Sequence, residues 1–495
     1  MSKKYVLGVD QSTQGTKALL FDQEGDLICR ADLSHEQIIN EKGWVEHNPA
    51  EIYDNMISVV RLVIERAGID KNEIAGLGIS NQRETAVVWD RETGEPLFNA
   101  IVWQCARGEA ICQRIAETDS NKTLVQSHTG LPLSPYFSAA KIAWVLQNVK
   151  EAKEKSDRGA ICHGTVDSWL VYKLTGGKSY KTDYSNASRT QLFDIRNLRW
   201  DKEVCSLFGI NPDNLAEVCD SNACYGETDF EGFLDSPIPI HGVLGDSHGA
   251  LFGQGCLQEG MIKSTYGTGS SVMMNIGEQP VFSKKGVVTS LAWGMDGKVN
   301  YVLEGNINYT GAVISWIQND LKLIQSAKET QSLAESANPK DKTYLVPAFT
   351  GLGAPYWDSN ATGIISGITR TTGQAELVKA ALDCIAYQIT DIVSVMSQDA
   401  GVTIEELRVD GGPTKNSYLM QFQSDMLKIP VQVPSAEELS GIGAAYAAGL
   451  ALGVYERESL FSRMERRKFT PDMEEQVRTE KYNGWKHAVE LVLTK

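Results

Sequence analysis

An aspartate followed by small residues stands where an apolar strand gives way to a helical pattern. Asp246 follows the apolar run from Ile240 to Leu244. A carboxylate in this position can take the proton of an alcohol whose oxygen attacks a phosphoryl group, because such transfers depend mainly on positioning. The same pattern also fits an aspartate that only caps a helix. His248, two residues further on, fits a packing histidine as well as a catalytic one.

Two short turns rich in Gly, Ser and Thr could hold phosphate groups. The first contains Asp10 and Thr13, and the second runs from Tyr266 to Ser271; each lies between two strand-like runs. Backbone N–H groups and a Thr hydroxyl can bind a phosphate, while Asp10 can orient hydrated Mg²⁺, which prefers oxygen ligands. Either turn could also be an ordinary hairpin. Neither is a P-loop, because G-x-x-x-x-G-K-[ST] does not occur in the chain.

A third group of residues suits a molecule with neighbouring hydroxyls. Arg83 and Glu84 lie between two apolar runs and offer a donor fork beside an acceptor. Trp103 could pack against the C–H face of a carbohydrate. The alternative is a surface salt bridge and a core tryptophan.

The elements that must position these residues alternate between strands and helices, which indicates an α/β fold. A strand–turn–strand pattern occurs once in each half, so we expect two domains built from the same unit, with both turns facing one substrate and a boundary near residue 250. Residues 235–239 (DSPIP) could form a connection near the middle, and residues 441–453, rich in small side chains, predict a tightly packed helix. The expected strands are 5–9, 18–21, 27–29, 74–79, 85–89, 261–265, 272–276 and 407–409, and the expected helices include 49–67 and 418–426.

Composition narrows the possible classes of protein. The 495 residues and 42% hydrophobic content suit two domains. The net charge of −16 argues against binding nucleic acid or anionic membranes. Nine cysteines without C-x-x-C spacing predict unpaired thiols in a reducing compartment. Because no stretch of about 18 apolar residues occurs, we expect no membrane insertion and a cytoplasmic location.

Long segments of the chain resemble the FGGY carbohydrate kinase family, and within it the glycerol kinases. The resemblance implies two actin-like ATPase (ribonuclease H-like) domains, residues 1–250 and 251–495, with a cleft between them. It also implies ATP and Mg²⁺ as cofactors, a small polyol or sugar as acceptor, and a homo-oligomer, dimer or tetramer. The matching segments are GWVEHNPAEI (43–52), GISNQRET (78–85), NAIVWQC (99–105), GTVDSWLVYKLTG (164–176), TDYSNASRT (182–190), LVPAFTGLGAPYWD (345–358) and LRVDGG (407–412).

The resemblance assigns a role to each matching position. Asp246 is expected to be the catalytic base, Asp10 to help hold Mg²⁺, and Thr13 to approach the transferred phosphate. Four further positions are expected to line the acceptor pocket: Arg83, Glu84, Trp103 and Tyr136. Five are expected around ATP: Gly267, Thr268, Gly311, Gly412 and Asn416.

The sequence departs from the glycerol kinases inside the expected acceptor pocket. Ser247 and His248 replace two glutamines, and Ser271 replaces a phenylalanine. Both changes enlarge the pocket, so the acceptor could be a four- or five-carbon polyol rather than glycerol. A ketose kinase, such as a xylulokinase or ribulokinase, is the alternative. A non-catalytic actin-like sensor is a remoter one, because it would be expected to lose Asp10 or Asp246, and both are present.

Overall fold

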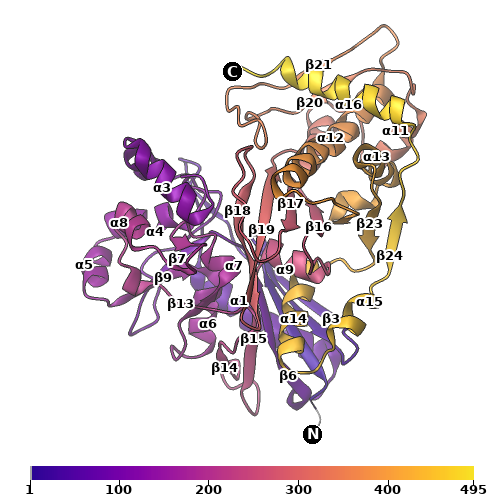
Figure 1. Cartoon of the computed structure of the whole chain (residues 1–495). Coiled ribbons are helices and arrows are strands. Elements are labelled where there is room, and N and C mark those ends of the chain that lie inside the picture. The colour runs from indigo at the N-terminus through magenta and orange to yellow at the C-terminus, as the bar shows by residue number, and fades with distance from the viewer. Residues whose placement is uncertain (1–2, 495) are drawn as a thin grey trace.

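The computed structural model describes residues 3–494, and a mixed six-stranded sheet organises its N-terminal half (Figure 1). The strand order is β14-β15-β6-β1-β2-β3. The first three strands in sequence pair antiparallel, while β6 and β15 extend the sheet in parallel from β1. The strands are β1 (Tyr5–Gln11), β2 (Gly15–Phe21), β3 (Leu27–Ser34), β6 (Ile74–Asn81), β14 (Gly226–Thr228) and β15 (Ile238–Gly245).

A second large sheet repeats this arrangement in the C-terminal half. Its order, β18-β19-β17-β16-β22-β23-β24, matches the first sheet read from β3 to β14, with β18 added at one edge. The pairings also match: two antiparallel, two parallel and one antiparallel. The prediction of two halves built from one unit is therefore confirmed. The strands are β16 (Ile262–Tyr266), β17 (Ser270–Asn275), β18 (Val288–Met295), β19 (Lys298–Ile307), β22 (Leu407–Asp410), β23 (Val431–Pro434) and β24 (Arg466–Phe469).

Helices cover the two sheets. α1 (Pro49–Ala67) has the predicted bounds because Asn48 caps its first turn and Gly68 ends it in the left-handed conformation. It packs on β2 and β3. On the second half lie α10 (Gly311–Asn319), α11 (Glu329–Ser336), α12 (Gln374–Ala400), α13 (Ser417–Leu427) and α16 (Glu475–Glu490), and the short strands β20 (Tyr344–Val346) and β21 (Ile364–Ser366).

An outer lobe extends the first half, on the left of Figure 1. It is built around the five-stranded sheet β4-β5-β8-β7-β9 and the helices packed against it. Its strands are β4 (Ile38–Ile39), β5 (Val45–His47), β7 (Ala86–Asp90), β8 (Ala100–Ile101) and β9 (Ile161–Thr165). Its helices are α2 (Glu109–Ala116), α3 (Asp119–Thr129), α4 (Ser138–Asn148), α5 (Ala152–Asp157) and α8 (Lys202–Phe208). α6 (Val166–Leu174) contacts both this lobe and the first sheet. Beside it, β10 (Lys181–Asp183) pairs with β13 (Glu217–Cys219), and α7 (Tyr184–Ala187) contacts both strands.

One helix from the C-terminal half completes the N-terminal half. α14 (Leu439–Ala451) packs against β1, β6, β15 and α9 (Asp246–Gly253). The approach is so close that a Cβ atom added to Gly78 would lie 2.2 Å from the Ala444 carbonyl oxygen, and one on Gly443 would lie 1.9 Å from that of Gly249. The predicted tightly packed helix is confirmed. No helix within residues 3–494 is long and apolar enough to cross a membrane.

The segment 235–239 does not connect the two halves, so that expectation was wrong. Its last residues begin β15, which still belongs to the first sheet. Two prolines are tolerated here because they lie where the strand starts, beside the short edge strand β14. The chain instead passes to the second sheet between α9 and β16.

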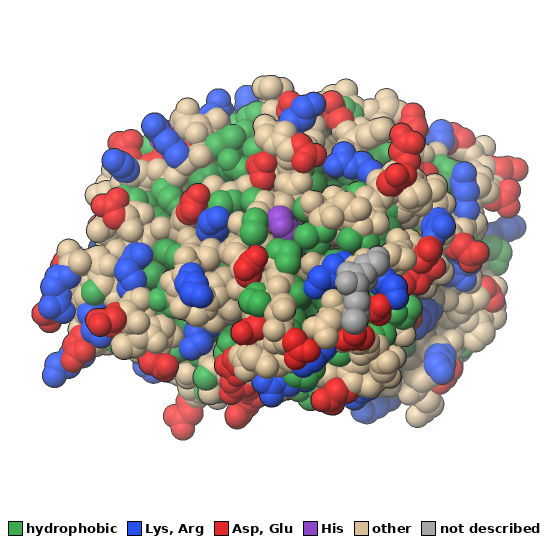
Figure 2. All heavy atoms as spheres, turned by 90° about the horizontal axis from the view of Figure 1, so that it is seen from below, with side chains coloured by type: hydrophobic (Ala, Val, Ile, Leu, Met, Phe, Trp, Pro, Cys, Tyr) green, Lys and Arg blue, Asp and Glu red, His purple; other side chains and the backbone are tan. Residues whose placement is uncertain are grey.

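On the face seen in Figure 2, acidic and basic side chains are interspersed, and neither kind forms a broad patch. This view gives no sign of a basic surface suited to nucleic acid.

Candidate active site

The expected catalytic residues meet where three neighbouring strands of the first sheet end. β1, β6 and β15 run parallel, with Asp10 beside Ser80 and Gly245 beside Asn81 in the register. Asp246 follows Gly245 as the first residue of α9. In open α/β sheets, the carboxyl ends of parallel strands are where ligand sites form.

Asp246 belongs to a cluster of five charged side chains. Arg83 places its Nε 3.1 Å from Asp246 Oδ1 and donates from both terminal nitrogens to Glu304, each at 2.9 Å. Arg189 donates from Nε to Glu84 at 2.5 Å, and its Nη1 lies 3.0 Å from Glu304. The two arginines and two glutamates are almost fully buried, whereas the Asp246 side chain is 35% exposed. Asp246 is therefore the member of the cluster that a dissolved molecule can reach.

Glu84 has a backbone conformation that costs free energy. Its φ is +58°, which a non-glycine residue rarely adopts. A turn in which Thr85 N donates to the Arg83 carbonyl at 2.7 Å holds it in place, together with a hydrogen bond from Ser138 Oγ to the Glu84 carbonyl at 3.1 Å. Backbone strain of this kind typically costs 1–3 kcal/mol and concentrates at functional sites.

Two aromatic rings form a wall beside the cluster. Trp103 and Tyr136 meet edge to face with ring centroids 5.6 Å apart. Trp103 Nε1 donates to Thr13 Oγ1 at 2.9 Å, so this wall contacts the first phosphate turn directly. Buried Lys141 braces the loop that carries Tyr136, donating to the carbonyls of Pro135 at 2.6 Å and Tyr136 at 2.5 Å.

Asp10 is buried at the end of β1 and accepts a hydrogen bond from Ser80 Oγ on Oδ1 at 2.9 Å. Burial raises the pKa of Asp10 to about 6, against the opposing effects of Ser80 and Lys17. A buried carboxylate whose charged form is disfavoured would be stabilised by a hard cation next to it. The donor chemistry at Asp10 therefore fits Mg²⁺.

Four of the five residues expected around ATP gather at the second turn, and the exception is Asn416. Gly311 N donates to the Gly267 carbonyl at 2.9 Å, and Thr310 N to the Thr268 carbonyl at 3.0 Å, which ties the turn to the start of α10. A Cβ atom on Gly411 would lie only 2.0 Å from the Tyr266 carbonyl oxygen, so Gly412 is also held close to the turn.

Asn416 lies just beyond this group, and its amide has structural partners. Its Oδ1 caps α13 by accepting from Leu419 N at 3.0 Å, and its Nδ2 donates to Thr330 at 3.1 Å.

The three positions that depart from the glycerol kinase pattern differ in exposure. Ser247 is half-buried, and its N–H donates to Asp246 at 2.5 Å. Ser271 lies between Thr265 and Asn306 in the second sheet; its hydroxyl is buried and has no hydrogen-bond partner within residues 3–494. His248 is fully buried, and burial, with the nearby Arg83, lowers its pKa well below the ordinary value. The packing interpretation of His248 is thus the better one.

Sequence reasoning did not single out Glu304 and Arg189. The amino-acid sequence nevertheless contains a feature that points to each of these two residues. Glu304 is the only charged residue in the run YVLEGNI (301–307), and Arg189 lies inside the family segment TDYSNASRT. A single charge in a buried strand needs a partner, which predicts a site even where the partner is unknown.

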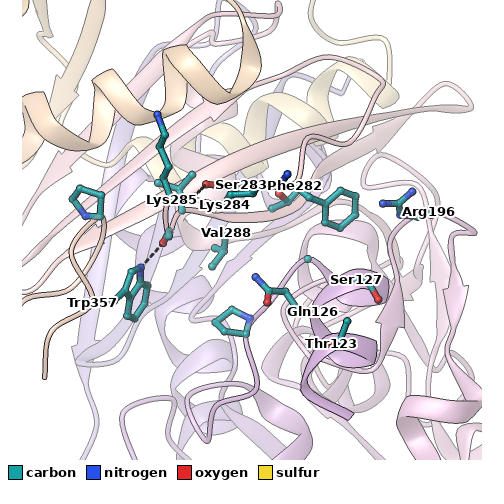
Figure 3. Close-up of a pocket in the computed structure, with 16 residues that line it drawn as sticks. Thr123, Gln126, Ser127, Arg196, Phe282, Ser283, Lys284, Lys285, Val288 and Trp357 are labelled. Atoms are coloured by element: carbon teal, nitrogen blue, oxygen red, sulfur yellow. Dashed lines mark hydrogen bonds between the residues drawn. The ribbon is translucent and has the colours of Figure 1, made fainter. Parts of the chain in front are cut away.

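A separate cavity of about 680 Å³ lies between α3 and residues 282–289 (Figure 3). Arg196 lies over the Phe282 ring at 4.3 Å, and Trp357 Nε1 donates to the Gly286 carbonyl at 2.9 Å. The residues that line this cavity include none of the residues expected to bind ATP, Mg²⁺ or the acceptor.

Comparison with known proteins gives the family. The model of the N-terminal domain of the FGGY family of carbohydrate kinases matches residues 5–253, and that of the C-terminal domain matches residues 262–452. The chain belongs to the FGGY family of carbohydrate kinases. Full-length FGGY relatives include the glycerol kinases of Alkaliphilus oremlandii, 47% identical over 99% of this chain and 98% of that protein, and Bacillus subtilis, 44% identical over 99% of both.

Solved FGGY structures confirm the expected fold of two actin-like, ribonuclease H-like domains. Plasmodium falciparum glycerol kinase with ADP superposes with a TM-score of 0.94 at 37% identity, covering 100% of this chain and 99% of that one. A xylulose kinase from Lactobacillus acidophilus has a TM-score of 0.88 at 20% identity, covering 99% and 97%, and shows the shared fold alone. The protein is thus an ATP-dependent kinase of the FGGY family that acts on an alcohol group.

Proposed function

We propose that the protein transfers the γ-phosphoryl group of ATP to a hydroxyl of a small polyol, with Asp246 as the base. The observation that carries the proposal is the geometry around Asp246. It is the one partly exposed carboxylate of a buried charge cluster, and Arg83 orients it at 3.1 Å. A base fixed in this way meets the positional demand of phosphoryl transfer to an alcohol.

Other residues would bind Mg²⁺ and the nucleotide. Asp10 would hold Mg²⁺, which neutralises charge on the phosphates when bound. Thr13 and the exposed turn residues Gly267 and Thr268 would face the phosphates. Gly311, Gly412 and Asn416 would lie around the rest of the nucleotide.

The acceptor molecule would be recognised by hydrogen bonds and by shape. Arg83 and Glu84 would hydrogen-bond neighbouring hydroxyls, and Trp103 and Tyr136 would pack against the carbon chain. Relatives named glycerol kinase, at 44–48% identity over the whole length, support a glycerol-like reacting end. Ser271 and Ser247 would leave room for a fourth or fifth carbon. The ketose kinase alternative has support at the level of the fold alone.

A substrate panel tests the acceptor. The initial rates of ADP release would be measured with glycerol, erythritol, pentitols, xylulose and ribulose. Losing the apolar contact of one phenylalanine costs a small substrate about 1–3 kcal/mol. We therefore expect a four- or five-carbon polyol to have the highest kcat/KM. A glycerol value at least tenfold above all others would show that the pocket is not enlarged in function.

Replacing the base tests the mechanism. Asp246→Asn keeps the shape of the side chain but cannot accept the proton, so kcat should fall about 10²–10⁴-fold. Binding of a non-hydrolysable ATP analogue, measured by calorimetry, should stay unchanged. Turnover within tenfold of the original protein would exclude Asp246 as the base.

The family resemblance extends the proposal to the assembly, a dimer or tetramer of identical chains in the cytoplasm. The molar mass measured by light scattering during size-exclusion chromatography distinguishes these assemblies from a monomer.

A further inference from the structure

Glu304 comes from the second sheet but contacts arginines of the N-terminal half. It lies within β19, where Val302 and Leu303 are fully buried, and it is itself 1% exposed. Its ion-pair partners, Arg83 and Arg189, both belong to the N-terminal half. One carboxylate of the C-terminal half therefore contacts two cations of the other half.

The two arginines make Glu304 a permanent anion. Burial alone would raise the pKa of this carboxyl group, but Arg189 and Arg83 offset the burial and hold the pKa below its ordinary range. A buried carboxylate bound by a two-pronged guanidinium is among the stronger polar contacts in proteins. Removing one partner of such a group leaves the other buried and unpaired.

This contact decides how Arg83 meets Asp246. The guanidinium group is planar and rigid, so binding both terminal nitrogens to Glu304 fixes the direction of Nε. Asp246 then receives one contact from Arg83, through Nε at 3.1 Å, instead of a two-pronged one, and its other contact is the Ser247 N–H. Both contacts are on Oδ1, so Oδ2 keeps its lone pairs for an alcohol proton, whereas a two-pronged pair with arginine would occupy both oxygens.

We propose that Glu304 is a positioning residue for phosphoryl transfer: it holds the fork of Arg83 away from Asp246, so that the base is oriented but not neutralised. The inference rests on the proposed role of Asp246. It also makes the acceptor site depend on the second sheet, because Arg83 is correctly placed only when β19 lies against it.

Glu304→Gln tests this directly, since glutamine keeps the size of the side chain but loses its charge. Arg83 would then turn its fork toward the remaining carboxylates. We expect kcat to fall about 10–100-fold, with a smaller rise in the acceptor KM and an unchanged KM for ATP. Glu304→Asp should restore part of the rate.

Two controls make the outcome decisive. Glu278→Gln removes an exposed carboxylate of the same half, whose partner Lys298 lies 3.9 Å away, and should change neither kcat nor the acceptor KM. Melting temperatures and binding of an ATP analogue check that each variant is folded. If folded Glu304→Gln has kcat within threefold of the original protein, or if Glu304→Asp restores none of the lost rate, the positioning role is wrong. If Asp246→Asn also stays active, the proposed base has failed instead, which separates the two ideas.

Discussion

The indole of Trp103 joins two parts of the site that are far apart in the sequence. Its Nε1 hydrogen-bonds Thr13 in the phosphate turn, while its ring packs against Tyr136 in the proposed acceptor wall. Trp103→Phe keeps an aromatic face but removes the donor. Since one such hydrogen bond contributes about 1 kcal/mol, kcat should fall roughly fivefold with little change in the acceptor KM.

Steady-state kinetics with both substrates varied would measure this effect. The matched control is Trp200→Phe, whose Nε1 donates at 2.8 Å to the Ala216 carbonyl, outside the site. An equal loss in both variants, or a change confined to the acceptor KM, would mean that Trp103 only packs.

The sequence predicts residues at the ends of strands better than residues in the middle of strands. Asp10 and Asp246 could be found because each stands near the end of an apolar run, at an edge where ligands bind. Glu304 could not be assigned, because its meaning depends on Arg83 and Arg189, which only the packing of the two sheets brings to it. Asn416 matches the family pattern, yet its amide is occupied by the cap of α13.

At the scale of elements, α14 and α9 meet with no room between their backbones. Gly443→Ala would place a methyl group 1.9 Å from the Gly249 carbonyl oxygen, which belongs to the helix that begins with Asp246. The helices must separate, so we expect a loss of about 1–3 kcal/mol in stability, a melting temperature several degrees lower and a reduced kcat.

Gly373→Ala is the matched control. Its new methyl group would meet only the Glu376 carboxylate, at 3.4 Å, on the exposed start of α12. Similar melting temperatures for the two variants in a thermal denaturation experiment would contradict the tight contact.

The small residues of 441–453 predicted such packing from the sequence alone. They could not predict the surface involved, because small side chains carry no information about their partner.

At the scale of the whole molecule, the buried carboxylate of Asp167 should make stability depend on pH. It accepts hydrogen bonds from Thr165 and Thr182, while burial, and secondarily Asp183, raises its pKa to about 7. The folded state therefore binds this proton more tightly than the unfolded state, whose pKa lies near 4. Stability should be lost as pH rises from about 4 to about 7, by an amount of the order of 4 kcal/mol.

Asp167→Asn tests the effect, because asparagine keeps the shape without the charge. Urea unfolding of both proteins at several pH values between 5 and 8 should show the original protein losing stability relative to the variant as the pH rises. Parallel curves would show that Asp167 does not titrate in this range.

The repeat of the two sheets could be predicted only weakly, because the two turns share residue types rather than an alignment. Strand pairing shows it clearly, since the order β3-β2-β1-β6-β15-β14 recurs as β19-β17-β16-β22-β23-β24. Pairing between distant strands depends on the whole fold, which local patterns cannot specify.

The position of α14 has a consequence for synthesis. A ribosome releases β1, β6, β15 and α9 in the first half of the chain, but the helix that covers them comes from residues 439–451. Until then, the glycine-lined face that receives α14 stays open to water, and an emerging chain with an uncovered apolar face is a substrate for chaperones. A nonsense mutation shortly before residue 439 would accordingly damage the amino-terminal half, although every residue of that half had been made.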